Sequence, residues 1–176
     1  MNKTVLIKIA CVALVFVFVV FELFAHVLPS ADVLNARSFD APIKVDEAAF
    51  PDPVFKGFVS EKVDTNADGY VTPQERDAVT TISASDFQGE TVSNATGVEL
   101  FPQLEALDLS GGSLNSLDVS KNVKLKSINL ENNNETSGTS FSLDLPQNAQ
   151  NVITIYVSAN SSITGNSDNV NIVRVE

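Results

Sequence analysis

The sequence predicts an α+β protein, in which a helix–loop–helix unit is followed by short strands that repeat along the chain. Three observations support this prediction: an oxygen-rich segment at 64–75, a regular series of leucines over 104–130, and an apolar run near the N-terminus. We expect four parts, which are a signal peptide or N-terminal membrane anchor at 1–31, a linker at 32–47, the helix–loop–helix at 48–80, and the repeated strands with a divergent C-terminal cap at 81–176.

The N-terminal segment has the composition of an export signal. Lys3 and Lys8 precede an unbroken apolar run from Ile9 to Phe21. A basic start followed by a short apolar stretch is typical of a secretory signal, and the run is short for a membrane span. Cleavage of the segment and its retention as a membrane anchor both stay open. In either case we expect the remainder to be secreted or to lie at the cell surface.

Charge and residue types exclude several classes of function. The net charge of −11 disfavours nucleic acid as a partner and favours cations. Cys11 and His26 are the only cysteine and histidine, and both lie in or beside the N-terminal segment. The exported part therefore has no thiol and no imidazole, which excludes Ser-His-Asp and Cys-His hydrolases and zinc enzymes. We expect a monomer that is not an enzyme.

The segment 64–75 has the spacing of a calcium-binding loop. Calcium takes six to eight oxygen ligands, and alternate residues of a tight loop point inward. Gly69 stands at the sixth place, where such a loop turns sharply. This is the pattern of an EF-hand, and it predicts Ca²⁺ as the bound ion. An acidic Asx-turn without a metal is the alternative. The expected ligands are Asp64, Asn66, Asp68, Thr72 and Glu75 through their side chains and Tyr70 through its carbonyl.

Helical signals flank the loop on both sides. Pro53 to Lys62 carries apolar residues at helical spacing, with the proline in the first turn. Thr72 and Glu75 form a capping-box pattern, and Pro73 occupies the first position of the exiting helix. Val71 is the apolar residue that anchors the loop. These signals predict a single EF-hand unit.

The leucines that follow repeat at a fixed distance. Leu107-Asp108-Leu109 and Ile128-Asn129-Leu130 are 21 residues apart, and Leu117-Asp118-Val119 lies almost midway between them. On each short strand two inward side chains flank one outward residue, which is the pattern of leucine-rich repeats. Such repeats bury their apolar side chains only against their neighbours, so we expect a short, mainly β solenoid of about three to four coils. We expect further strands at 82–84, 153–157 and 170–175. A small β-sandwich is the alternative.

The order of these motifs resembles a family of bacterial secreted or surface leucine-rich-repeat proteins, the internalin-J-like group, which carry an EF-hand-like loop before their repeats. The resemblance extends roughly from Phe50 to Asn134 and implies a right-handed solenoid with a binding or adhesion role. Gly111-Gly112 departs from the family pattern, which usually has an Asn after the strand. The residues that carry the resemblance are Phe50-Pro51-Asp52, the loop Asp64 to Glu75, Ile82-Ser83-Ala84, Gly97 to Phe101, Leu104 to Ser110, and Leu117 to Asn122.

Our leading expectation is a protein in which calcium is mainly structural and the EF-hand caps the first coil of the solenoid. A surface of the repeats would bind an extracellular protein or glycan. Its candidate residues are the outward row Asp108, Asn129 and Thr154 with Tyr156 beside it, although plain solvent exposure explains them equally well. A dockerin-like anchoring module would need a second calcium loop, and only one is found. A carboxylate-based glycosidase would need a marked pair of acids and an aromatic platform, and neither is found.

Overall fold

The computed structural model describes residues 41–133, 140–159, 162–164 and 169–175. All of these residues except Ala41 belong to one compact unit, Pro42–Glu176. The predicted signal or anchor segment at 1–31 and most of the predicted linker at 32–47 lie outside the described residues. Within the described ranges, no helix has the length and apolar character that a membrane crossing needs.

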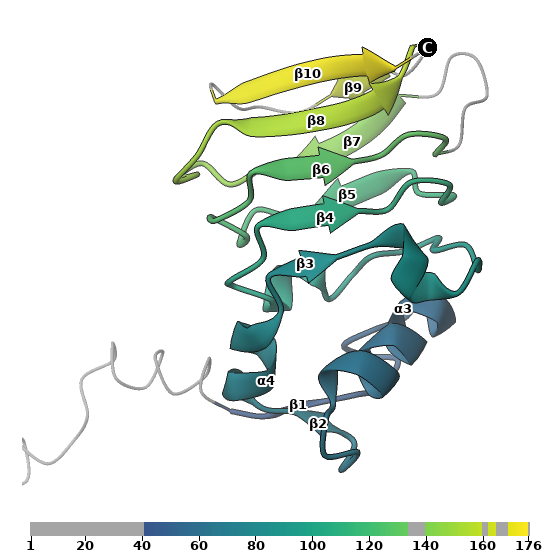
Figure 1. The fold of residues 1–176 in the computed structure, drawn as a ribbon, viewed down its shortest axis with the longest axis vertical. Helices are drawn as coiled ribbons and strands as arrows, with labels where there is room; N and C mark the ends of the chain where they lie inside the picture. Colours follow the sequence, from purple (N-terminus) through teal and green to yellow (C-terminus); the bar gives the residue numbers. More distant parts are fainter. Residues whose placement is uncertain (1–40, 134–139, 160–161, 165–168, 176) are drawn as a thin grey trace, which may run out of the picture. The chain divides into compact units, whose positions relative to one another are not determined.

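The unit is a mixed α and β fold with few helices and two parallel sheets (Figure 1). The larger sheet has five strands in the order β10-β8-β6-β4-β3 and the smaller has three in the order β5-β7-β9. From β4 onward, successive strands alternate between the two sheets. All pairs within both sheets are parallel, which rules out the β-sandwich alternative, since sandwiches are built from antiparallel strands. The bounds are β3 Thr81–Ile82, β4 Ala106–Asp108, β5 Ser116–Asp118, β6 Ser127–Asn129, β7 Ser140–Asp144, β8 Ile153–Ser158, β9 Ser162–Thr164 and β10 Val170–Val175.

The register brings the repeated leucines into line. Leu107 of β4 lies opposite Ile128 of β6, and Ile128 lies opposite Ile155 of β8. In the smaller sheet, Leu117 pairs with Leu143. All five side chains are buried in one continuous core, so the two sheets share their apolar interior. The strands predicted near 107, 117 and 128 are therefore confirmed, each beginning one residue before the predicted start.

A glycine pair after β4 makes room for an amide from the next repeat. Asn133 is buried, and its Nδ2 donates to the carbonyl of Leu109 at 2.7 Å while its Oδ1 accepts from the N–H of Leu114 at 3.1 Å. A Cβ at Gly112 would overlap Asn133 Oδ1 and approach the carbonyl of Val92 to 2.9 Å. The asparagine that the family pattern expects at this turn is thus replaced by one that reaches back from the following turn.

The helical elements precede the sheets. Helix α3 (Pro53–Phe58) continues into a π-helical turn (Val59–Val63), and helix α4 (Pro73–Ala78) follows the loop. The short strand β2 (Tyr70–Val71) pairs antiparallel with β1 (Ile43–Lys44). Residues 43–44 lie within the predicted linker at 32–47, because two residues carry too little periodicity to predict a strand.

The segment predicted as a strand at 82–84 differs in the structure. Strand β3 ends at Ile82, and Ser83 caps a 3₁₀ turn (Ala84–Phe87) instead. Asp86 Oδ2 accepts the Ser83 N–H at 2.9 Å, so a local side-chain bond ends the strand.

Phenylalanines join the helices to the sheets. Phe55 of α3 lies 6.1 Å from Phe50 and 6.4 Å from Phe87, measured between ring centroids. Phe50 in turn stacks on Phe101 at 6.4 Å, just before the repeated strands begin. These rings belong to the same core as the leucines, so α3 packs on the end of the five-stranded sheet nearest β3 (Figure 1). Aromatic pairs of this kind add stability beyond their buried area.

Candidate functional site

The ends of the loop 64–75 are fixed by regular structure. Asp64 terminates the π-helical turn, and its N–H donates to the carbonyl of Val59 at 2.9 Å. Near the other end, Val71 is fully buried and lies opposite Ile43 in the β1–β2 pair. The loop therefore begins and ends on packed residues, while its middle faces solvent.

The carboxylate of Asp64 organises the first half of the loop. The residue is only 5% exposed, and its Oδ1 accepts from the Asp68 N–H at 3.2 Å while its Oδ2 accepts from the Gly69 N–H at 2.9 Å. Gly69 has a φ of +83°, a left-handed conformation that a residue with a Cβ avoids. The turn predicted at Gly69 is therefore present.

Two exposed side chains continue the same arrangement. Asn66 Oδ1 accepts from the Asp68 N–H at 3.1 Å, and Asn66 Nδ2 donates to Asp68 Oδ2 at 3.0 Å. Asp68 Oδ1 accepts from the Tyr70 N–H at 2.8 Å. The Tyr70 side chain is exposed, so its identity has no role in closing the loop. The three polar side chains predicted for the first half of the loop thus form one hydrogen-bonded group.

Glu75 closes the loop from the other side. Its Oε1 accepts from the N–H of Thr65 at 2.9 Å and from the Thr65 hydroxyl at 2.8 Å. Its Oε2 accepts from the N–H and hydroxyl of Thr72 at 2.9 and 2.8 Å, which completes the predicted capping box. These donors, the Thr72 backbone N–H foremost, lower the pKa of Glu75 to about 2. The carboxylate is therefore ionised at neutral pH and connects the start of the loop to α4.

The donor chemistry of this loop suits a hard cation, because every candidate ligand offers oxygen. In the part of the chain that the structure describes, however, no three His, Cys, Asp or Glu side chains converge as they would around a metal ion. Asp64, Asp68 and Glu75 instead accept hydrogen bonds from the loop itself. Binding of Ca²⁺ would require these carboxylates to exchange some of those donors for the ion.

The predicted ligand-binding row on the larger sheet differs in register. Asp108 lies opposite Asn129, and Asn129 lies opposite Tyr156. Thr154 belongs to the neighbouring row, where it lies opposite Ser127. Thr154 was predicted for the first row, and that prediction is wrong because β8 is longer than the strands before it, which leaves its register open.

The polar members of this row serve the turns that follow their strands. Asp108 Oδ1 accepts from the Ser110 N–H at 2.9 Å, and Asn129 Oδ1 accepts from the Glu131 N–H at 3.0 Å. Both bonds are Asx-turns, which hold the chain as it leaves a strand. These side chains therefore have a structural role that explains their presence without a ligand.

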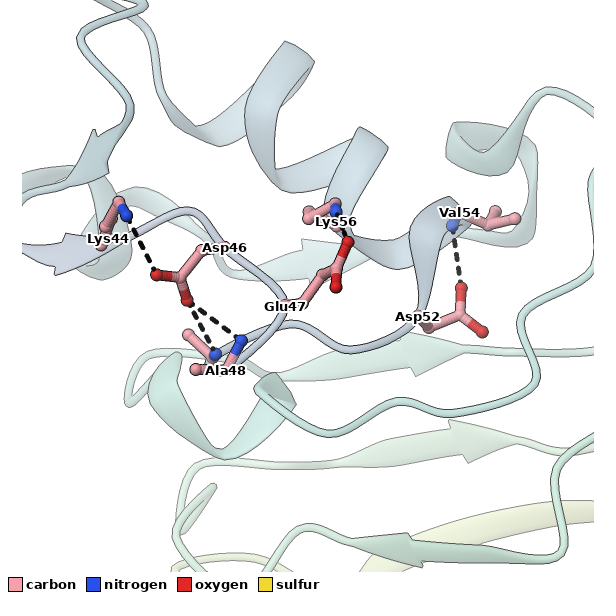
Figure 2. Close-up of polar contacts among 8 residues, drawn as sticks. Lys44, Asp46, Glu47, Ala48, Asp52, Val54 and Lys56 are labelled. Carbon is pink, nitrogen blue, oxygen red and sulfur yellow. Dashed lines mark hydrogen bonds and ion pairs between the residues drawn. The ribbon is translucent and has the colours of Figure 1, made fainter.

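A buried carboxylate outside the loop, Asp52, is not among the predicted site residues. Asp52 is 3% exposed and caps α3, with its Oδ1 accepting from the N–H of Val54 at 2.9 Å (Figure 2). The same oxygen accepts from the N–H of Phe55 at 3.0 Å. Its Oδ2 accepts from the N–H and hydroxyl of Ser93 at 2.8 and 2.7 Å and from the Asn94 N–H at 3.0 Å. Burial acts to raise the pKa of Asp52, but these donors outweigh it and lower the pKa. An Asp directly before a Pro is a helix-start signal that could have indicated the cap.

Comparison with known proteins adds no further assignment. Neither the protein-family models nor the curated proteins give a match to this chain. The loop at 64–75, its flanking helices and the two parallel sheets are therefore the observations from which a function can be inferred.

Proposed function

We propose that the chain is an exported, non-enzymatic calcium-binding protein of the leucine-rich-repeat type. One Ca²⁺ ion at 64–75 would stabilise an EF-hand unit that caps a short solenoid. The observation that carries this proposal is the loop itself, in which six oxygen donors occur at the spacing of a calcium loop between two helical segments. The function of the solenoid would be to bind an extracellular protein or glycan.

Local geometry supports an EF-hand unit. Gly69 adopts the left-handed turn that the sixth loop position needs, and Glu75 occupies both the last loop position and the capping box of α4. Val71, the apolar residue of the loop, is fully buried. The arrangement thus agrees with the EF-hand pattern at its turn, its anchor and its closing carboxylate.

The surroundings favour a structural ion over a regulatory one. Sensor EF-hands open a hydrophobic groove when calcium binds. Here Phe55 and Phe58 of α3 already pack with Phe87 in the core, and β2 is already paired with β1. An ion at the loop would therefore hold together elements that are packed, instead of releasing a covered face.

The parallel sheets support a short leucine-rich-repeat solenoid. Leu107 and Ile128 lie opposite each other and are 21 residues apart, so one repeat separates neighbouring strands of the larger sheet. The strand between them, β5, belongs to the other sheet. A chain that returns to the same sheet after each repeat, with parallel pairing, winds as a coil.

Thermal unfolding with and without calcium tests the proposal. At a free Ca²⁺ concentration near one hundred times the dissociation constant, the ion should stabilise the fold by roughly 2.7 kcal/mol, and chelator should remove this gain. Glu75→Gln should abolish most of the response, because glutamine keeps the capping box but lacks the second carboxylate oxygen. Asp77→Asn, on the exposed side of α4, is the matched control and should keep the response.

Two results would contradict calcium binding. One is a melting temperature that is the same in millimolar calcium and in chelator. The other is an equal calcium response in the native chain and in Glu75→Gln. Isothermal titration with Ca²⁺ would separate a weak site from no site, since extracellular calcium can fill a site of even millimolar affinity.

A further inference from the structure

A groove of about 560 Å³ lies along the ends of β5 and β7 in the three-stranded sheet. It shares no residue with the loop 64–75 or with the row that contains Asp108 and Asn129. The register places Asp118 directly opposite Asp144, so two carboxylates lie side by side where these strands end. Both residues are exposed, because the residues before them point into the core.

The lining of the groove combines hydrogen-bond donors, acceptors and an apolar surface. The half-buried Val123 and the buried Leu145 contribute the apolar part. Two carboxylates, one ammonium, one hydroxyl and two amides contribute the polar part, from Asp118, Asp144, Lys121, Ser120, Gln147 and Asn148. The groove contains charges of both signs beside neutral polar groups, so it differs from a site that is built for a single ion.

Local hydrogen bonds hold the groove in place. Asp118 Oδ1 accepts from the Ser120 N–H at 2.9 Å, which fixes the carboxylate beside the groove and uses one of its two oxygens. The Val119 N–H donates to the carbonyl of Asp144 at 2.9 Å, which ties the two strand ends together. The Asp118 carboxylate and the two strand ends are therefore positioned before any ligand arrives, which lowers the entropic cost of binding.

We propose that this groove binds a neutral carbohydrate. Each sugar hydroxyl is both a donor and an acceptor, so neighbouring hydroxyls can donate to Asp118 and Asp144 and accept from Lys121. The C–H face of a sugar ring can pack on Leu145 and Val123. The groove lies within the range of volumes, roughly 300–1,000 Å³, that small-molecule sites have. A basic peptide is the competing occupant, because Asp118 and Asp144 outnumber Lys121, and the experiment below includes one for that reason.

This inference rests on the proposed function only in taking the chain to be a non-enzymatic binding protein. The groove and the calcium loop have no residue in common, so the two proposals can fail separately. Binding should therefore be measured on the full chain in saturating calcium, beside the melting experiment described above.

The test is a glycan array of neutral oligosaccharides of glucose, galactose, mannose and N-acetylglucosamine, followed by calorimetric titration with the strongest binder. Asp118→Asn and Asp144→Asn should each weaken binding about tenfold or more, since each removes a charge-assisted hydrogen bond. Asp46→Asn is the matched comparison, because Asp46 makes a turn bond of the same kind, at 3.1 Å to the Ala48 N–H, and lies outside the groove. Its affinity should equal that of the native chain.

One further result would support the proposal independently of the variants, and three results would overturn it. Backbone amide shifts at Gln147 and Asn148 on titration with the sugar, observed by NMR, would support the groove even if a variant proved unstable. The proposal is overturned if no neutral oligosaccharide binds at millimolar concentration, if Asp46→Asn weakens binding as much as Asp118→Asn, or if a tri-lysine peptide binds more tightly than every sugar.

Discussion

The N-terminal half of the described unit, residues 42–102, and the C-terminal half, residues 103–175, both bury polar side chains, but those side chains differ in charge. Among the described residues, the N-terminal half buries Asp52, Asp64 and Arg76, whereas the C-terminal half buries the amides Asn122 and Asn133. A buried carboxylate needs several hydrogen-bond donors, and its contribution to the stability of the fold depends on pH. A buried amide does not titrate, so its contribution does not. We therefore expect the first half to respond to acid and cations and the second to respond mainly to packing.

The difference follows from how each half satisfies the hydrogen-bonding groups of its backbone. In the C-terminal half, parallel strands pair with their neighbours, and each strand repeats the contacts of the one before. In the N-terminal half, α3 and α4 have only six residues each, and helices this short are not stable alone. At the start of α3, Asp52 accepts the Val54 N–H, and at the start of α4, Glu75 accepts the Thr72 N–H. Carboxylates there satisfy backbone donors, as strand pairing does in the sheets.

The largest effect should come from the buried phenylalanines of the N-terminal half. Phe55→Ala should lower the free energy of unfolding by about 3–5 kcal/mol, because the side chain is fully buried among other aromatic rings. Leu125→Ala, equally buried in the C-terminal half, should cost about 2–5 kcal/mol. Urea denaturation followed by circular dichroism measures both. Since the rings and leucines form one core, each variant should unfold in a single transition, and two transitions would show that the halves are independent.

Removal of the buried carboxylate at the start of α3 should have the next largest effect. Asp52→Ala should cost about 2–3 kcal/mol at pH 7, because it leaves five donors from α3 and the 93–94 segment without their acceptor. Hydrogen exchange at the Ser93 and Asn94 amides should accelerate more than exchange in β6.

Asp46 provides the control for this variant. It accepts from the N–H groups of Ala48 and Ala49 but lies at the surface beside Lys44 (Figure 2). Asp46→Asn should therefore leave the urea midpoint nearly unchanged. Equal losses for Asp46→Asn and Asp52→Ala would mean that burial does not distinguish the two caps.

The buried amide that connects the halves should have a smaller effect. Asn122 Nδ2 donates to the carbonyls of Val98 and Phe101 at 3.0 and 2.8 Å. Asn122→Ala leaves both carbonyls without this donor and should cost about 1–3 kcal/mol. The cost should be the same at pH 7 and pH 4, because an amide does not titrate in this range. A cost that changed with pH would remove the distinction between the halves.

Local signals in the sequence predicted much of this fold. The capping box of Thr72 and Glu75 and the turn at Gly69 depend on neighbouring residues, and both are present. The repeated leucines predicted the strands, because inward side chains at a constant spacing impose one register. The two-residue strand β1 has no such signal and is defined only by its partner β2.

Contacts between distant residues could not be predicted in this way. Asp52 binds Ser93, 41 residues further along the chain, and Asn133 reaches back to Leu109 across one repeat. Each contact forms only when two distant segments meet in the folded chain, and the local pattern of either segment does not identify its partner. Thr154 shows the same limit, because a strand longer than its neighbours can pair in more than one register.

Acidification should produce the smallest and most selective change. The pKa of Glu75 is about 2 in the folded chain against an ordinary 4.5, and the pKa of Asp52 is also lowered from its ordinary 3.8. A carboxyl group whose folded pKa is lowered contributes stability that is complete above its unfolded pKa and is lost as pH falls through the folded pKa. In chelator, the N-terminal half should therefore loosen between pH 4.5 and about pH 2, with the Thr65 and Thr72 amides exchanging faster before those of β4 and β6. Glu75→Gln should flatten this part of the profile, because glutamine does not titrate. If the β4 and β6 amides exchanged first, or if the variant followed the native profile, the carboxylates would not be what holds the helical elements together.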